Sequence, residues 1–291
     1  MKMLYLDCAM GAAGDMLTAA LLELLPEPEQ FVDELNALGI PGVTFRRVPA
    51  EKCGIRGTQM SVLVDGQEEG ETHHHAPEEH HHHHHHEHRS LRDIAALLER
   101  LPLSEGVRAQ VMAVYTRIAE AESAAHGCPV EQIHFHEVGA MDAVADITAV
   151  CLLMDRLAPE RVVVSPVHVG SGQVRCAHGV LPVPAPATAY LLRDVSIYGG
   201  AIQGELCTPT GAALLRQFAS EFGPMPLMRV EAVGYGMGKK DFEAANCVRA
   251  MLGAAEDAPE AVLELQCNLD DMTAEAAGFA MERLLDAGAL D

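Results

Sequence analysis

The chain has 291 residues, a formal net charge of −22 and a hydrophobic content of 49%. This length suffices for a real core in two domains, whereas the negative charge argues against nucleic acids and anionic membrane surfaces as partners. No uncharged apolar segment reaches about 18 residues, so we expect no membrane-spanning helix. Asp7 interrupts the first apolar run, unlike in a signal peptide. We therefore expect a cytoplasmic protein whose eight scattered cysteines are reduced.

Apolar periodicity predicts helices and strands that alternate along the chain. In the first part we expect a strand over 2–7, a helix over 11–25, a helix over 29–38, and strands over 43–49 and 57–64. Later we expect helices over 90–100, 104–126 and 140–157, a strand over 161–165, a structured loop region over 166–186, a helix over 208–223, strands over 225–233, 246–253 and 261–268, and a last helix from near Thr273. This order predicts an α/β or α+β fold with a mixed sheet and flanking helices, and it is too irregular for a doubly wound sheet.

Residues 66–88 have no apolar periodicity and are low in complexity, which is typical of a disordered linker. Eleven of the sixteen histidines fall there, and seven of them are consecutive. Imidazole suits nickel, copper and zinc, and nearby glutamates raise the local concentration of cations. An affinity tag and a pH-responsive spacer without a metal role are the alternatives. We favour metal binding, without selectivity among these ions, by His73, His74, His75, His80, His81, His82, His83, His84, His85, His86 and His88.

A second group of candidate ligands lies farther along the chain. His134 and His136 alternate, so on a strand they face the same way, and Glu137 follows directly. Asp142 and Asp146 are four residues apart, so they lie on one face of the expected helix. Two imidazoles with two or three carboxylates suit a divalent cation or acid–base chemistry. The alternative is that Asp142 interacts only with the helix dipole and that the histidines are surface residues.

A glycine-rich segment supplies a third group of candidates. Gly170 and Gly172 lie close in sequence to His168, Cys176 and His178. Glycines let backbone amides approach an anion, and a cysteine and a histidine two residues apart could hold a soft metal or a sulfur-rich substrate. A tight loop at the sheet edge, without a binding role, is the alternative.

Two more glycine turns carry charged residues. Gly11 and Gly14 precede Asp15 at the start of a helix, where free amides can bind phosphate, although the Walker and dinucleotide-binding motifs are both absent. Asp15 is equally interpretable as a ligand or as a structural cap. Lys239 and Lys240 follow a third glycine turn, where they could meet a phosphate or simply be solvated.

Several long motifs occur in one fixed order along the chain. They are YLDCAMGAAGDM, HFHEVGAMDAVADI, GSGQVRCAHGVLPVPAPAT, ELCTPTGAALL, GYGMGKKD and NLDDMTAE. Together they resemble the LarC family, the nickel insertion proteins of nickel-pincer-nucleotide biosynthesis. The resemblance covers nearly the whole chain apart from the histidine-rich segment, which is itself a family feature of variable length.

The resemblance implies nickel insertion into pyridinium-3,5-bisthiocarboxylic acid mononucleotide. In that family two sulfurs and one pyridinium carbon become nickel ligands, so the step is a cyclometallation by a lyase-type enzyme. CTP hydrolysis with a divalent cation, Mg²⁺ or Mn²⁺, accompanies this step. Full-length members are expected to form homo-oligomers.

Under this resemblance the candidate residues take specific roles. We expect catalytic roles for His136, Glu137 and Asp142, with His136 or Glu137 removing the proton from the carbon that nickel binds. His134 and Asp146 are expected to join the histidine-rich segment as metal ligands. Contacts to the nucleotide are expected from Gly11, Gly14, Asp15, Gly170, Gly172, His178 and Lys239.

The resemblance also sets the expected domain organisation. Longer relatives continue past the NLDDMTAE segment into a C-terminal domain associated with CTP binding and oligomerisation, which some members encode as a separate reading frame. The chain thus resembles the first part of such a protein, and a separate C-terminal chain is an expected partner. We expect an N-terminal βα segment of the main domain over 1–65, a disordered histidine-rich linker over 66–89, the rest of the main domain over 90–255, and the start of a truncated C-terminal domain over 256–291.

Two other functions stay open from the residues alone. The chain could be a non-enzymatic nickel storage protein or metallochaperone, whose function would be lost on deletion of residues 72–88. It could also be a metal-dependent hydrolase that uses the histidines and carboxylates between His134 and Asp146. Turnover of generic phosphate esters with added Mn²⁺ would support the hydrolase.

Overall fold

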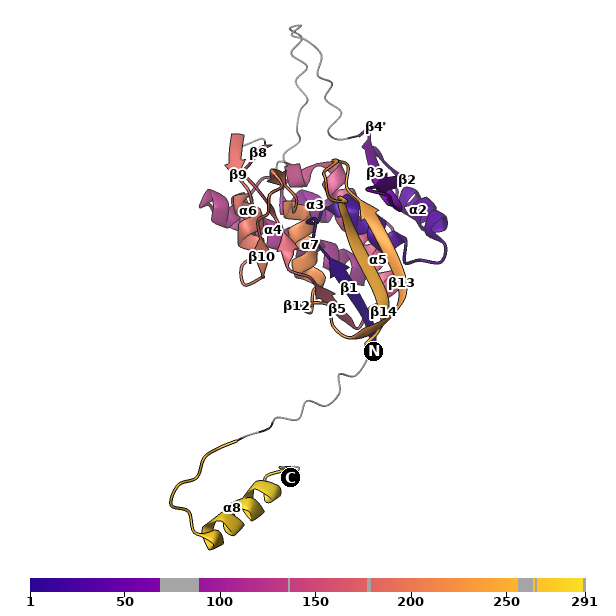
Figure 1. Cartoon of the computed structure of the whole chain (residues 1–291). Coiled ribbons are helices and arrows are strands. Elements are labelled where there is room, and N and C mark those ends of the chain that lie inside the picture. Colours follow the sequence, from indigo (N-terminus) through magenta and orange to yellow (C-terminus); the bar gives the residue numbers. More distant parts are fainter. Residues whose placement is uncertain (69–88, 136, 177–178, 256–263, 265, 290–291) are drawn as a thin grey trace. The chain divides into compact units, whose positions relative to one another are not determined.

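The computed structural model describes residues 1–68, 89–135, 137–176, 179–255, 264 and 266–289 (Figure 1). The chain divides into two compact units, Met1–Glu256 and Asp257–Asp291. The expected segments 1–65 and 90–255 both fall in the first unit. The expected histidine-rich linker lies mostly outside the described residues, so its disorder stays a prediction.

An eight-stranded mixed sheet forms the centre of the first unit, with the order β12-β5-β1-β14-β13-β3-β2 and β4 paired to β3. Its β1–β5, β5–β12 and β13–β3 pairs are parallel, and the other pairs are antiparallel. The strands are β1 (Lys2–Asp7), β2 (Val43–Lys52), β3 (Ile55–Val64), β4 (Gln67–Glu68), β5 (Arg161–Val164), β12 (Glu221–Phe222), β13 (Met228–Met237) and β14 (Cys247–Ala255). This arrangement confirms the predicted mixed sheet with flanking helices.

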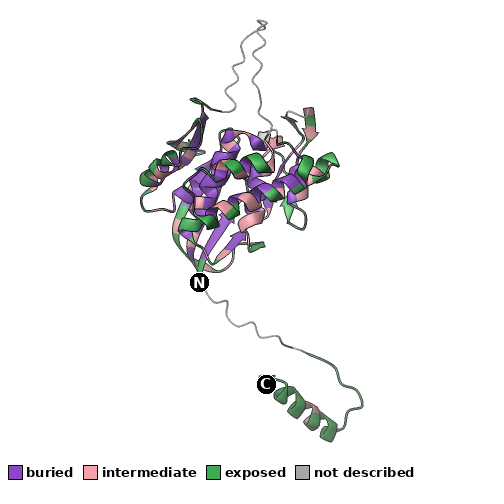
Figure 2. Cartoon of the chain, turned by 180° about the vertical axis from the view of Figure 1, so that it is seen from behind, coloured by how far each residue is buried: buried purple, intermediate pink, exposed green. Residues whose placement is uncertain are grey.

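The helices of the first unit pack on the sheet and on one another (Figures 1 and 2). α1 contacts β3 and β13, α5 contacts α1 and β3, and α4 packs against α5, α6 and α7. The helices are α1 (Gly14–Leu22), α2 (Pro28–Ala37), α3 (Leu91–Leu98), α4 (Glu105–His126), α5 (Met141–Leu157), α6 (Pro186–Leu191) and α7 (Pro209–Phe218), with two short 3-10 turns at Val130–Gln132 and Glu137–Gly139. One large hydrophobic core joins these helices to one face of the sheet.

Local signals in the sequence explain where several helices begin and end. Ser90 and Asp93 form a capping box at the start of α3, and Ser104 accepts a hydrogen bond from the amide of Val107 at the start of α4. Gly127 ends α4 in the left-handed conformation that glycine adopts without strain. These caps satisfy amides and carbonyls that helix ends leave without partners.

The close packing of α1 on β13 depends on glycines in the strand. A Cβ at Gly236 would lie 1.8 Å from the carbonyl oxygen of Met16, and one at Gly234 would lie 2.1 Å from that of Ala20. Any side chain at these two positions would therefore push α1 off the sheet. The contact buries most of α1, including Leu17 and Leu21, and a buried leucine side chain contributes about 1.5–3 kcal/mol of stability.

The segment expected to be a structured loop region forms short strands. They are β6 (Val167–His168), β7 (Gly170–Ser171), β8 (Gln173–Cys176) and β9 (Gly179–Pro182), and later segments add β10 (Ile197–Tyr198) and β11 (Gly204–Glu205). β10 pairs with β6, β11 with β7, and β8 with β9. These three two-stranded ribbons are separate from the main sheet.

Two predicted elements differ from the structure. The helix expected over 208–223 ends at Phe218, because Ala219 is extended and the amide of Ser220 donates to the carbonyl of Val162. The chain then joins the sheet as β12. The strand expected over 261–268 is wrong for its described residues, 264 and 266–268, which form no strand.

The second unit contains the helix α8 (Ala274–Asp286). The hydroxyl of Thr273 accepts a hydrogen bond from the amide of Ala276 and so caps the helix at the predicted position. Its apolar side chains, such as Phe279, Met281 and Leu284, are exposed within the described chain.

Candidate functional site

Two carboxylates from separate helices lie together at the start of α1. Asp15 is in the first turn of α1, and Asp146 is on α5. A Cβ at Gly14 would lie 2.6 Å from Oδ2 of Asp146, so only glycine leaves room for this carboxylate beside α1. The glycine predicted as a nucleotide contact therefore has a structural role, because it allows α1 and α5 to approach.

The loop after β13 brings a lysine to the same place. The ammonium of Lys239 forms an ion pair with Oε1 of Glu68 on β4, at 3.1 Å, and it is close enough to Asp15 and Asp146 for their charges to affect its pKa. We call Asp15, Glu68, Asp146 and Lys239 the charged cluster. Its members come from α1, β4, α5 and the β13–β14 loop, so the fold and not the local sequence assembles it.

Burial and charge act in opposite directions on the pKa values in the charged cluster. Burial raises the pKa of Asp15 above its usual range, and the nearby Glu68 raises it further, while Lys239 and the amide of Met16 oppose this shift. Burial alone would lower the pKa of Lys239, but its hydrogen bond to Glu68 and the negative charges of Asp15 and Asp146 raise it. Lys239 therefore stays protonated at neutral pH, and Asp15 is a better proton acceptor than an ordinary aspartate.

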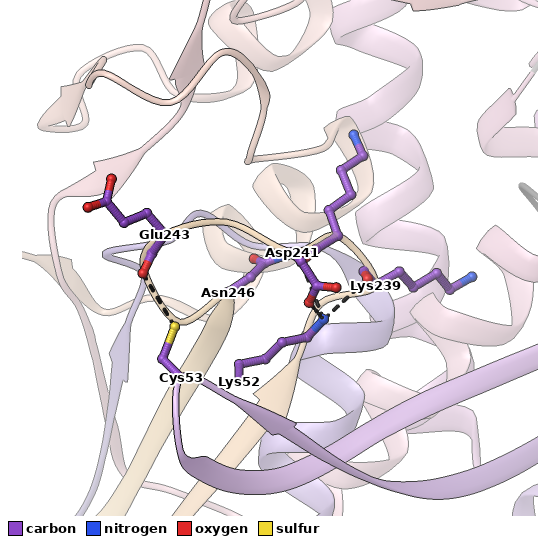
Figure 3. Close-up of polar contacts among 7 residues, drawn as sticks. Lys52, Cys53, Lys239, Asp241, Glu243 and Asn246 are labelled. Atoms are coloured by element: carbon purple, nitrogen blue, oxygen red, sulfur yellow. Dashed lines mark hydrogen bonds and ion pairs between the residues drawn. The ribbon is translucent and has the colours of Figure 1, made fainter.

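The β2–β3 turn fixes the loop that carries Lys239 (Figure 3). The ammonium of Lys52 donates to the carbonyl oxygens of Lys239 and Lys240, at 3.3 and 3.4 Å, and forms an ion pair with Asp241. Nδ2 of Asn246 donates to the carbonyl of Lys240 at 2.9 Å. These bonds hold the loop backbone in place. The point from which the Lys239 side chain extends is therefore fixed.

Asp142 lies on the same side of α5 as Asp146. Both carboxylates contribute to a raised pKa of Tyr115, after the larger effect of the complete burial of this phenol. The Tyr115 hydroxyl donates to the carbonyl of Val138 at 3.3 Å, just before α5. The four-residue spacing thus gives the shared helix face that the sequence predicts, and the functional role of Asp142 stays a prediction.

His134 is exposed between the buried side chains of Ile133 and Phe135. It lies near Asp93, whose pKa is lowered first by hydrogen bonds from Ser90 and to a smaller extent by His134. In the part of the chain that the structure describes, no hydrogen bond or ion pair joins His134 to Asp146. The metal-ligand role of His134 therefore stays a prediction.

Several candidate residues lie outside the part of the chain that the structure describes. His136, His178 and the histidines from His73 to His88 lie outside the described residues, and nothing is described of the Glu137 side chain. The backbone of Glu137 begins the 3-10 turn that leads into α5. The roles of all these residues stay predictions.

The other glycine candidates pack against neighbouring protein segments. A Cβ at Gly11 would lie 2.0 Å from the carbonyl oxygen of Leu206, and one at Gly170 would lie 2.0 Å from that of Gly204. A Cβ at Gly172 would lie 2.3 Å from the side-chain oxygen of Gln203. Gly11 and Gly170 leave no room for a side chain against these backbone carbonyls. At Gly172 the exposed Gln203 side chain can move aside, and it is the positive φ of 81° that favours glycine. The contacts of these three glycines with a nucleotide stay predictions.

Two residues that contact the loop and the charged cluster were not among the predicted site residues. The sequence indicates Glu68 only as one of the glutamates beside the histidine-rich segment, and Lys52 has no motif around it. His168, from the third group of candidates, is buried, its Nδ1 lies 2.9 Å from the carbonyl oxygen of Ala9, and its ring stacks on Tyr198. Because a carbonyl can only accept, Nδ1 is the donor in this hydrogen bond.

The described residues contain neither a metal-ligand cluster nor a membrane-spanning helix. Within those residues no three side chains of His, Cys, Asp or Glu are grouped so as to hold a metal ion. No helix there is both long enough and apolar enough to cross a membrane.

Comparison with known proteins gives matches over the whole chain. Residues 4–291 match the family model described as nickel insertion protein. A protein of Desulfitobacterium hafniense (strain DSM 10664 / DCB-2), named pyridinium-3,5-bisthiocarboxylic acid mononucleotide nickel insertion protein, is 42% identical over all of this chain and 70% of its own length. Proteins of the same name from Geobacillus kaustophilus and Staphylococcus saprophyticus are 38% and 37% identical, over 72% and 69% of their own lengths and 100% and 99% of this chain. No solved structure matches the chain.

Proposed function

The chain belongs to the nickel insertion protein family, and from this premise we propose that it inserts nickel into pyridinium-3,5-bisthiocarboxylic acid mononucleotide. The relatives carry this activity in their names, and the sequence motifs that resemble the family run through the described fold. Nickel is a substrate of this reaction. The ion replaces the proton on one pyridinium carbon, and that proton must be accepted by a base.

The charged cluster is the observation that carries the proposal for where the reaction occurs. A carboxylate with a raised pKa is a better proton acceptor than an ordinary aspartate, and the partly buried Asp15 has this property. Lys239 offers a permanent positive charge for a phosphate or a thiocarboxylate of the substrate. We add Asp15 to His136 and Glu137 as candidates for the base. Asp15 lies in the first turn of α1, and the motif with His136 and Glu137 directly precedes α5, which carries Asp146.

In this proposal the histidine-rich segment collects nickel, and the charged cluster takes part in its insertion. Glu68, the last described residue before that segment, is ion-paired with Lys239. The histidine-rich segment therefore follows a member of the charged cluster directly in the sequence. The segment raises the local concentration of nickel, and the cluster supplies the chemistry.

CTP and its divalent cation are expected only from the family resemblance. The amide of Gly11 donates to the carbonyl of Cys8, and that of Ala12 donates to the carbonyl of Leu206. The turn before α1 therefore does not fit a triphosphate, because two of its amides are already bonded to protein. The role of CTP stays a prediction, as do the expected homo-oligomer and the separate C-terminal chain.

Mass spectrometry of the mononucleotide tests the proposed function. The purified chain is incubated with Ni²⁺ and the thiolated mononucleotide, with and without CTP and Mg²⁺. The expected product has gained one nickel ion and lost the carbon-bound proton. No nickel-bearing product under any of these conditions would refute the proposal.

A double substitution tests the predicted contribution of the histidines before α5. His134→Ala with His136→Ala is expected to lower the rate of nickel insertion. His126→Ala serves as the control, because His126 is in the last turn of α4, where its partner is Glu122. If the double variant inserts nickel at the wild-type rate, His134 and His136 have no role in the reaction.

A further inference from the structure

Three arginines line one pocket outside the charged cluster. Arg117 comes from α4, Arg193 follows α6, and Arg216 is on α7. α4, α6 and α7 contact one another and lie side by side in Figure 1. The pocket they enclose has a volume of about 110 Å³, which is room for a phosphate group and not for a whole nucleotide. In a chain with 20 basic and 42 acidic residues, three converging arginines need an explanation.

Contacts on the inner side of each guanidinium hold two of these arginines in place. Nε of Arg117 donates to the side-chain oxygen of Gln217 at 2.8 Å, and Gln217 in turn donates to Gln110 at 2.7 Å. Nε of Arg193 donates to the carbonyl of Tyr190 at 3.2 Å, and its guanidinium lies 3.6 Å from the centre of the Tyr190 ring. Both side chains are thus oriented through Nε, while the terminal nitrogens keep their donors for another group.

Carboxylates also line the pocket but do not neutralise the arginines. Glu120 and Asp194 are both exposed. Across the described residues, no ion pair within 4.0 Å forms between any of the three arginines and a carboxylate. Elsewhere in the same unit, Arg156, Arg161 and Arg249 each pair with a carboxylate at 2.5–2.6 Å. The pocket therefore differs from the ordinary use of arginine in this chain.

We propose that the pocket between α4, α6 and α7 binds a phosphate group through Arg117, Arg193 and Arg216, and we call it the arginine pocket. A planar guanidinium donates two parallel hydrogen bonds to phosphate oxygens, and oriented donors lose little entropy on binding. The phosphate belongs either to the mononucleotide substrate or to a separate phosphate-bearing ligand. This inference goes beyond the proposed function and can succeed or fail independently of it, because phosphate binding is measured without nickel.

Calorimetric titration of the full chain with inorganic phosphate, at low ionic strength, tests the arginine pocket. Saturable binding to the wild-type chain is expected, with affinity at least about tenfold weaker in Arg117→Gln/Arg193→Gln. The matched control is Arg92→Gln/Arg100→Gln, which removes two exposed positive charges from the α3 region. This control is expected to bind phosphate like the wild type, since the net charge changes equally in both double variants.

The single variant Arg193→Gln keeps the test decisive if the double variant unfolds. Arg193 is exposed and lies outside the helix interiors, so its loss should leave the circular dichroism spectrum unchanged. Absence of saturable phosphate binding in the wild type, or equal binding in wild type, Arg193→Gln and the control, would overturn the proposal. In the nickel insertion assay, a raised KM for the mononucleotide in Arg193→Gln identifies the substrate as the source of the phosphate. An unchanged KM with weakened phosphate binding identifies a separate ligand.

Discussion

The charged cluster and the arginine pocket arrange opposite charges in two different ways. In the cluster, one ammonium is ion-paired with Glu68 and lies near the charges of Asp15 and Asp146, and burial raises the pKa of Asp15. In the pocket, three guanidinium groups face two exposed carboxylates without pairing to them. The first arrangement suits the transfer of a proton, and the second suits the binding of an anion. One acidic chain thus separates these two tasks by using different layers of its fold.

The largest expected effect comes from Asp15→Asn, which keeps the shape of the side chain and removes its capacity to accept a proton. The rate of nickel insertion is expected to fall about 100-fold, as for loss of a general base. The control is Asp155→Asn, an exposed carboxylate on α5. Equal rates for Asp15→Asn and wild type would break the comparison, since the cluster would then have no part in proton transfer.

The same substitution is expected to change stability in the opposite direction. Because the pKa of Asp15 is raised in the folded chain, the folded state binds more protons than the unfolded state between pH 3.8 and the raised value. Stability therefore falls as pH increases through this window, and the loss persists at neutral pH. Urea unfolding should show Asp15→Asn to be more stable than wild type at pH 7, with the difference vanishing below the unfolded pKa. A variant that is less stable at pH 7 would contradict the assigned cause.

Lys239→Met is expected to have the next largest effect. It removes the only basic member of the charged cluster, so nickel insertion should slow about tenfold, as expected for loss of a charged contact to the substrate. The free energy of unfolding should fall by only about 1 kcal/mol, because the Lys239–Glu68 pair is partly exposed. Lys240→Met is the adjacent control and should change neither value. Identical results for the two lysine variants would show that position in the cluster is irrelevant.

Lys52→Met tests whether the loop that carries Lys239 must be held in place for substrate binding. The Lys52 side chain is 11% exposed, and its ammonium bonds to the loop carbonyls. A loosened loop should raise the KM for the mononucleotide a few-fold, on the order of 1 kcal/mol, with a smaller change in kcat. Arg56→Met in the same hairpin is the control, because the Arg56 side chain is 90% exposed. A large fall in kcat with unchanged KM would instead assign Lys52 a direct part in the chemistry.

Deletion of residues 72–88 is expected to have the smallest effect on the reaction. The number of nickel ions bound per chain, measured by equilibrium dialysis, should fall sharply, because the deletion removes eleven of sixteen histidines. At saturating nickel, kcat should stay close to wild type, since the charged cluster is intact. Complete loss of function at saturating nickel would favour a metallochaperone or storage protein over an insertase.

Sequence patterns predicted the helices that carry the charged cluster better than they predicted which residues belong to it. α1 and α5 have strong apolar patterns, and the spacing of Asp142 and Asp146 correctly gave one helix face. The pairing of Glu68 with Lys239 depends on the neighbouring positions of β3 and β13 in the sheet. No local pattern encodes that neighbourhood, so the sequence indicates Glu68 only as one of the glutamates beside the histidine-rich segment.

Glycine turns show a second limit of sequence reasoning. Gly11, Gly14, Gly170 and Gly172 were expected to approach a nucleotide, and each of them closely approaches another protein segment. The sequence shows that a position tolerates only a small residue, but it does not show what occupies the neighbouring space. In contrast, the early end of α7 at Phe218 follows from a tertiary bond, between Ser220 and Val162, that overrides helical periodicity.

The most direct test of the central claim follows the hydrogen on the carbon that nickel binds. A mononucleotide deuterated at that carbon is incubated with Ni²⁺ and either the wild-type chain or Asp15→Asn, and the products are analysed by mass spectrometry. With the wild-type chain, the account predicts a product that has gained nickel and lost deuterium, and it predicts very little of that product with Asp15→Asn. A nickel-bearing product that keeps its deuterium, or equal loss of deuterium with both chains, would contradict it.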